Sequence, residues 1–188
     1  MNWHEDKRWS DIFMPEIKAI LGMQLLGEAP YEEDALRATD LIVLCMLPVR
    51  VAVRMRKKQY AINTQYLQEF TVRSDRPSGT KTELLKILSG FGDFLFYGFE
   101  DQEGGRLGKW TLIDLFVFRE HYTRMQYLSE KNVVPGQSMQ NTDRSSSFCV
   151  FRYKDFPSKL IRASGHGVNL ELFNSFIRKE KILIASTT

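Results

Sequence analysis

The sequence predicts an α/β or α+β fold in which helices flank one mixed β-sheet. Apolar residues recur at spacings of three and four in "DIFMPEIKAILGMQLL" and "TELLKIL", which is typical of helices that cover a core. By contrast, "RVAVRMRKK" and "QEFTVRS" alternate with a period of two, as strands do. Because segments with the two periods follow one another along the chain, we expect helices and strands to share one core.

Length and composition are those of an ordinary globular protein. The chain has 188 residues, of which 43% are apolar and 26% charged, enough for a single domain with a full hydrophobic core. We expect that domain to span 1–188, with its core in 1–130, a mobile loop over 133–147, and a C-terminal strand and helix in 148–188.

The cysteines and the apolar runs indicate a cytoplasmic protein. Cys45 and Cys149 match neither a disulfide framework nor a metal-ligand spacing. The first residues lack the apolar stretch of a secretion signal, and no run is long and apolar enough to span a bilayer. We therefore expect no membrane partner.

The first half of the chain predicts a helix followed by three strands. Pro15 fits the first turn of a helix over 11–26, with Ser10 or Asp11 as its cap. Its expected buried stripe consists of Ile12, Phe13, Ile17, Ile20, Leu21 and Met23 or Gln24. After an acidic connection, "TDLIVLCM" is apolar on both faces, which is typical of a strand covered on both sides.

The next two strands each combine an apolar face with a charged face. In the first of these strands, alternation places Val51, Val53 and Met55 on one face. It places Ala52, Arg54 and Arg56 on the other. The second opposes Phe70 and Val72 to Glu69, Thr71 and Arg73.

The second half predicts a helix, a hairpin and a further helix. A capping box formed by Thr80 and Glu83 opens the first helix, and Gly90 ends it. The remaining elements are strands at 93–99, 109–115 and 148–156 and helices at 116–129 and 169–181. Asp114 is expected to be a buried polar residue or a cap at a strand end, and "SGHG", from Ser164, to be a loop.

If the three strands of the first half are neighbours, their charged side chains gather in one region. These residues are Asp40, Arg54, Arg56, Glu69 and Arg73. Buried charges of this kind must pair, face water or hold a ligand, because unpaired burial costs several kcal/mol each. The alternative is an ordinary solvent-exposed face with salt bridges of about 0–1 kcal/mol.

The order of helix, three strands, helix and strand, with Asp40 in "TDL" ahead of "VAVRMR" and "EFTVRS", resembles the PD-(D/E)XK nuclease-like superfamily. Phage-encoded members have stretches similar to "FTVRS" and "TELLKIL", and the resemblance covers roughly residues 3–99. It implies a restriction-endonuclease-like mixed sheet flanked by helices, and a Mg²⁺-dependent (or Mn²⁺-dependent) nuclease acting on DNA or RNA.

In that family a helix carboxylate, a strand aspartate and an E-x-K on the next strand bind Mg²⁺ and activate water. The metal ligands that the resemblance implies here are Glu16, Asp40 and Glu69, although Glu16 also suits an exposed helix position. The catalytic set would combine Asp40 and Glu69 with Arg54, Arg56 and Arg73.

One departure from the family pattern concerns the E-x-K, where this chain has Arg54-Met55-Arg56. An arginine neither ligates Mg²⁺ nor acts as a base at neutral pH. Either the site has moved across strands to Glu69, or the fold binds without cutting.

Four further cations are candidate nucleic-acid contacts. Arg76 and Lys81 flank a glycine-containing turn that opens a helix, which is either an anion site or ordinary capping. Lys57 and Lys58 follow the arginine strand. A net charge of +3 permits such a patch without requiring it.

Three hypotheses follow: a metal-dependent nuclease, a non-catalytic module on the same fold that binds nucleic acid or an acidic protein, and a structural or regulatory phage protein. The sequence does not decide whether the ligand is DNA or RNA, whether it is single- or double-stranded, or whether the protein forms a homodimer.

Overall fold

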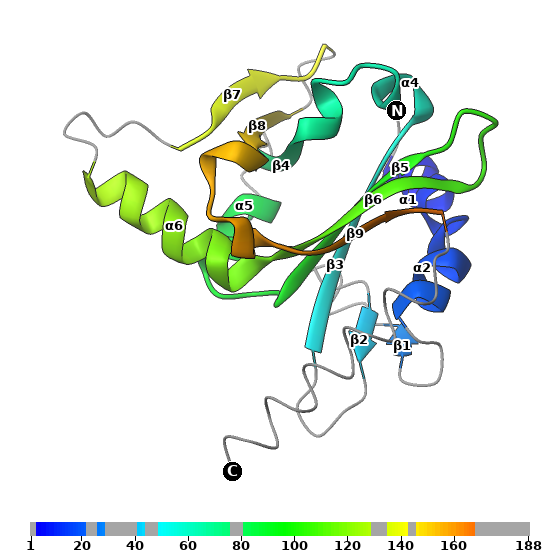
Figure 1. The fold of residues 1–188 in the computed structure, drawn as a ribbon, viewed down its shortest axis with the longest axis horizontal. Helices are drawn as coiled ribbons and strands as arrows, with labels where there is room; N and C mark the ends of the chain where they lie inside the picture. The colour runs from blue at the N-terminus through cyan, green and yellow to red at the C-terminus, as the bar shows by residue number, and fades with distance from the viewer. Residues whose placement is uncertain are drawn as a thin grey trace.

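The computed structural model describes residues 3–21, 26–28, 41–43, 49–75, 81–128, 135–142 and 146–167. It has a mixed α/β architecture with two sheets and a few helices. Figure 1 shows the larger sheet in the middle, with two N-terminal helices on one side and the smaller sheet and two further helices on the other.

The larger sheet is mixed, as predicted. Its strands, in the order β1-β2-β3-β5-β6-β9, are β1 (Leu26–Glu28), β2 (Leu41–Val43), β3 (Val49–Arg56), β5 (Phe94–Glu100), β6 (Leu107–Asp114) and β9 (Ile161–His166). The pair β3 and β5 is parallel, and the other neighbouring pairs are antiparallel.

The smaller sheet corrects the prediction of one sheet. Its strands, in the order β4-β8-β7, are β4 (Glu69–Asp75), β8 (Ser147–Arg152) and β7 (Gln137–Gln140). The strand expected beside β3 is therefore β4 of a separate antiparallel sheet, and part of the expected loop over 133–147 forms β7. Period-two alternation predicts a strand but does not specify its partner.

The N-terminal helices are α1 (Trp3–Asp11) and α2 (Met14–Leu21), where a single helix was predicted. Pro15 lies in the first turn of α2, as expected. The predicted stripe is buried in Phe13, Ile17, Ile20 and Leu21, whereas Ile12 is 49% exposed because it lies in the turn between the helices.

Short helices and α6 (Leu115–Leu128) connect the strands. The others are α4 (Lys58–Ala61), α5 (Glu83–Leu88) and the 3-10 turns η2 (Tyr66–Gln68), η3 (Tyr153–Asp155) and η4 (Ser158–Leu160). Asp114 caps α6, since its Oδ1 accepts hydrogen bonds from the N–H groups of Phe116 (2.9 Å) and Val117 (3.0 Å).

The larger sheet separates two hydrophobic cores. On its helix-side face, Val51 and Met55 of β3 pack with residues of α2 and with Phe96. On its inter-sheet face, Ala52 packs with Phe70 of β4 and with residues of α5, α6 and β8. The predicted division of β3 into two faces is confirmed.

Strand β9 replaces the loop predicted at "SGHG", because Ser164, Gly165 and His166 pair with β6. A Cβ at position 165 would lie 2.8 Å from Cζ2 of Trp110, so only glycine lets β9 pass this close to the indole. The indole Nε1 donates a hydrogen bond to the carbonyl oxygen of Gly167 (2.9 Å).

Several predictions fall outside the described residues, namely those on Asp40, Arg76, Thr80, the acidic connection and the helix over 169–181. Within the described ranges, no helix has the length and apolar character needed to cross a membrane.

Candidate functional site

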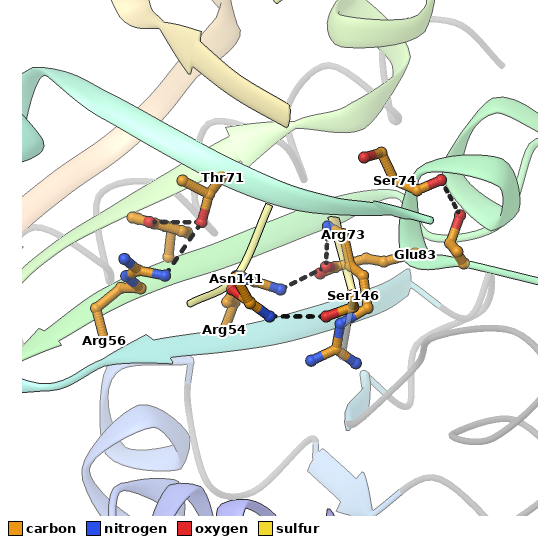
Figure 2. Close-up of polar contacts among 10 residues, drawn as sticks. Arg54, Arg56, Thr71, Arg73, Ser74, Glu83, Asn141 and Ser146 are labelled. Carbon is orange, nitrogen blue, oxygen red and sulfur yellow. Dashed lines mark hydrogen bonds and ion pairs between the residues drawn. The ribbon is translucent and has the colours of Figure 1, made fainter. Parts of the chain in front are cut away.

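The arginine side of β3 faces β4 of the other sheet. Nη1 of Arg54 lies 2.7 Å from Oε2 of Glu83, and the same oxygen accepts a hydrogen bond from the N–H of Arg73 (3.1 Å; Figure 2). Both members of the ion pair are largely buried, with 19% and 17% of their side chains exposed. Glu83 therefore links β3, β4 and α5, which differs from the capping-box role predicted for it.

Arg56, two residues further along β3, lies between an aromatic ring and β4. Its Cζ is 4.0 Å from the ring centroid of Tyr60, a cation–π distance. Its Nη1 is 3.5 Å from Oγ1 of Thr71, which is 3.2 Å from the hydroxyl of Tyr97 on β5 (Figure 2). Arg56 thus reaches the edge of a buried polar layer between the sheets.

Glu69 begins β4 and is buried, opposite Arg152 of β8. Burial raises the pKa of Glu69, because removal from water disfavours the charged carboxylate. The opposing influences are smaller: the charges of Arg152 and Arg56 and a hydrogen bond with Gln65. Glu69 of one sheet therefore lies within electrostatic range of Arg56 of the other.

The structure does not bring Glu16 and Glu69 together. Glu16 belongs to α2, on the helix-side face, and its Oε1 accepts a hydrogen bond from the N–H of Leu107 (3.1 Å). Glu69 belongs to β4, beyond the inter-sheet face. These two carboxylates therefore do not fit one shared metal ion, and the pairing of Asp40 with Glu69 stays a prediction.

Among the described residues, no group of three or more His, Cys, Asp or Glu side chains is placed to hold a metal ion. Other carboxylates instead hold backbone amides near the ends of β3 and β5. Asp93 accepts from the N–H of Arg50 (2.7 Å), and Glu100 accepts from Lys58 (3.2 Å) and Gly105 (2.9 Å). The bonds from Arg50 and Lys58 join residues far apart in the chain, and no local pattern in the sequence indicates them.

The predicted nucleic-acid-binding lysines fall into two places. Lys57 and Lys58 follow Arg56 directly, and Nζ of Lys57 lies 5.7 Å from the ring centroid of Trp9. Lys81 is exposed beside the N-cap of α5, Thr82, whose Oγ1 donates to the carbonyl oxygen of Ser74 (3.2 Å). Because Ser74 is near the far end of β4 from Glu69, Lys81 is separated from the other two lysines.

Two tyrosines beside these lysines were missed at the sequence level. The ring centroids of Tyr60 and Tyr66 are 5.9 Å apart in an edge-to-face arrangement, and Tyr66 is 38% exposed. The only sequence signal was their position after the basic run, in "RKKQYAINTQY". We name the group Arg56, Lys57, Lys58, Tyr60 and Tyr66 the strand-end cluster.

Comparison of the chain with protein-family models, with curated proteins and with solved structures gives no match.

Proposed function

We propose that this protein binds nucleic acid through the strand-end cluster, on a mixed α/β scaffold of restriction-endonuclease-like type. The observation that carries the proposal is the grouping of three consecutive cations, Arg56 to Lys58, with two tyrosines at the end of β3. Cations supply most of the affinity for a phosphate backbone, and aromatic rings add contacts to bases.

Most of the carboxylates around the cluster already have a partner. Glu69 is buried, both oxygens of Glu100 accept backbone N–H groups, and Oδ1 of Asp101 accepts from Gly104 (2.8 Å). Glu103, in the β5–β6 loop, is an exposed acid at this end. The hydrogen-bonded carboxylates are held in place, whereas Lys58 is exposed to solvent and can reach a phosphate.

Binding is favoured over cleavage by the position of the described acids. Metal-dependent phosphodiester cleavage requires carboxylates that converge on one or two ions. Glu16 and Glu69 lie on different sides of the larger sheet, and Glu83 is committed to Arg54. The described carboxylates therefore support a binding surface better than a nuclease centre.

Lys58→Ala tests the proposal. Removing one phosphate contact should weaken binding of a labelled DNA or RNA oligonucleotide and reduce the slope of log K against log salt by about 1. Fluorescence anisotropy at several salt concentrations measures both quantities. The matched control is Lys159→Ala, which removes an exposed lysine from η4 and should leave the affinity unchanged.

Absence of salt-sensitive binding by the native protein would refute the proposal. The nuclease hypothesis is tested in parallel by incubation with plasmid and single-stranded DNA in Mg²⁺ or Mn²⁺. Cleavage that disappears in both Asp40→Ala and Glu69→Ala would replace binding by catalysis as the function.

A further inference from the structure

The two tyrosines of the strand-end cluster indicate which form of nucleic acid, single-stranded or duplex, the cluster binds. Arg56 covers one face of Tyr60, which is half-buried and packs against the inter-sheet core. Tyr66 is the more exposed ring, and it contacts Tyr60 through the edge-to-face arrangement. One tyrosine therefore acts as a support, and the other presents aromatic surface to solvent.

The backbone between the tyrosines fixes the position of Tyr66. Oδ1 of Asn63 accepts a hydrogen bond from the N–H of Gln65 (2.9 Å), and the carbonyl oxygen of Asn63 accepts from the N–H of Tyr66 (3.0 Å). Asn63 thus closes the turn between α4 and η2 through both its side chain and its backbone. A ring held by a closed turn loses less conformational entropy when a ligand stacks on it.

Three cations belong to the same short segment as these two rings. Arg56 contacts Tyr60, and Lys57 and Lys58 are the two residues that follow Arg56 in the chain. The side chain of Lys58 lies near the β5–β6 loop, with Nζ close to Gly104. A strand whose phosphates contact these cations would have its bases within reach of a ring on the same short segment.

We infer that the strand-end cluster binds single-stranded nucleic acid, with an unpaired base stacked on Tyr66. This inference rests on the proposed function and specifies its ligand. In a duplex the faces of internal bases are covered by their neighbours, so a protruding ring gains nothing from them. An unpaired base offers a free face, and stacking on an aromatic side chain depends little on which base it is.

Tyr66→Ala tests the inference. We expect the affinity for a single-stranded oligo(dT) or oligo(U) to fall roughly 5- to 150-fold, the range for loss of one base–aromatic stack. The salt slope should not change, because no phosphate contact is removed. Fluorescence anisotropy with both oligonucleotides and with a duplex of equal length measures these effects and separates DNA from RNA.

Two control variants distinguish stacking from a structural effect. Tyr66→Phe keeps the ring and should retain the affinity of the native protein for single strands. Tyr127→Ala removes a tyrosine that is 89% exposed on α6, far along the chain, and should change nothing. A thermal melt of each variant checks that the fold is intact, and Tyr66→Trp should restore binding if Tyr66→Ala unfolds the turn.

The outcomes separate the two proposals. Equal salt-sensitive affinity for single strand and duplex, with no effect of Tyr66→Ala, would overturn the inference and leave nucleic-acid binding standing. Absence of binding to any of the three oligonucleotides would overturn both. Preference for the single strand that is lost in Tyr66→Ala and kept in Tyr66→Phe would support both.

Discussion

The two faces of β3 contact different kinds of side chain. On the helix-side face, Val51 and Met55 contact apolar side chains and require only matching shape. On the inter-sheet face, Arg54 and Arg56 require partners of particular chemistry, which are Glu83 for the first and Tyr60 for the second. The same strand therefore combines a face that tolerates many apolar partners with one that depends on a few polar contacts.

This difference explains where charge can be placed inside a sheet. Arg54 is partly buried because a carboxylate 29 residues away reaches it, and that carboxylate also accepts a backbone N–H from β4. The ion pair spans two sheets, so its formation is coupled to their docking. We propose that it selects the arrangement of the sheets, whereas apolar burial on both faces of the larger sheet supplies stability.

The largest expected effect comes from breaking the helix-side face. Phe96→Ala removes a ring that is fully buried and stacked on Trp110, with centroids 5.4 Å apart. The lost burial and the cavity should lower the free energy of unfolding by about 3–5 kcal/mol. Urea denaturation followed by circular dichroism measures this change.

The matched control is Phe116→Ala, because the side chain of Phe116 is 69% exposed on α6. It should change the free energy of unfolding by no more than about 0.5 kcal/mol. Similar losses in the two variants would contradict the view that burial of Phe96 on the helix-side face stabilises the fold.

The two faces also differ in how far the sequence predicted them. Periodicity predicted β3, its division into faces and the buried residues of α2, because these depend only on local spacing. It did not predict that β4 joins another sheet, or that Glu83 rather than a strand acid pairs with Arg54, since both depend on long-range docking. Strand β9 was missed because Gly165, needed beside Trp110, resembles a loop residue.

For the candidate site, the role of the cations stays a prediction. The run Arg54 to Lys58 was identified from its charge, and in the structure the charge of Arg56 acts on the carboxyl of Glu69. The stacking of Tyr60 on Arg56 was not predicted, because helical turns of four residues leave almost no periodic signal.

A smaller loss of stability is expected when the ion pair between Arg54 and Glu83 is broken. Glu83→Ala leaves Arg54 partly buried without its carboxylate and removes the acceptor for the N–H of Arg73. We expect a decrease of about 1–3 kcal/mol in the free energy of unfolding, the cost of unsatisfied buried polar groups. Urea denaturation at low and high salt measures it.

A double-mutant cycle with Arg54→Met shows whether the loss belongs to the pair. If it does, the double variant should be less destabilised than the sum of the single variants, with a coupling of about 0.5–3 kcal/mol. Strict additivity would mean that Glu83 acts only through the N–H of Arg73, and the proposed role of the ion pair in docking the sheets would be lost.

The smallest effect is expected at the buried carboxylate beside Arg56, and it depends on pH. Burial raises the pKa of Glu69 above its ordinary value of 4.5, so the folded protein binds this proton more tightly than the unfolded chain does. The stability gained from protonation is complete below the unfolded pKa and is lost as the pH rises through the folded pKa. Glu69→Gln, a neutral isostere, should therefore be more stable than the native protein at neutral pH.

The advantage of Glu69→Gln should shrink as the pH falls and vanish below about 4.5, where Glu69 is protonated in both states. Chemical denaturation between pH 4 and pH 8 measures this difference, with Glu120→Gln, which changes an exposed carboxylate of α6, as the control. A Glu69→Gln variant that is less stable at neutral pH would show that Arg152 and Arg56 outweigh burial. Charge pairs would then stabilise the inter-sheet face. That face would differ from the apolar helix-side face even more than the burial of Glu69 indicates.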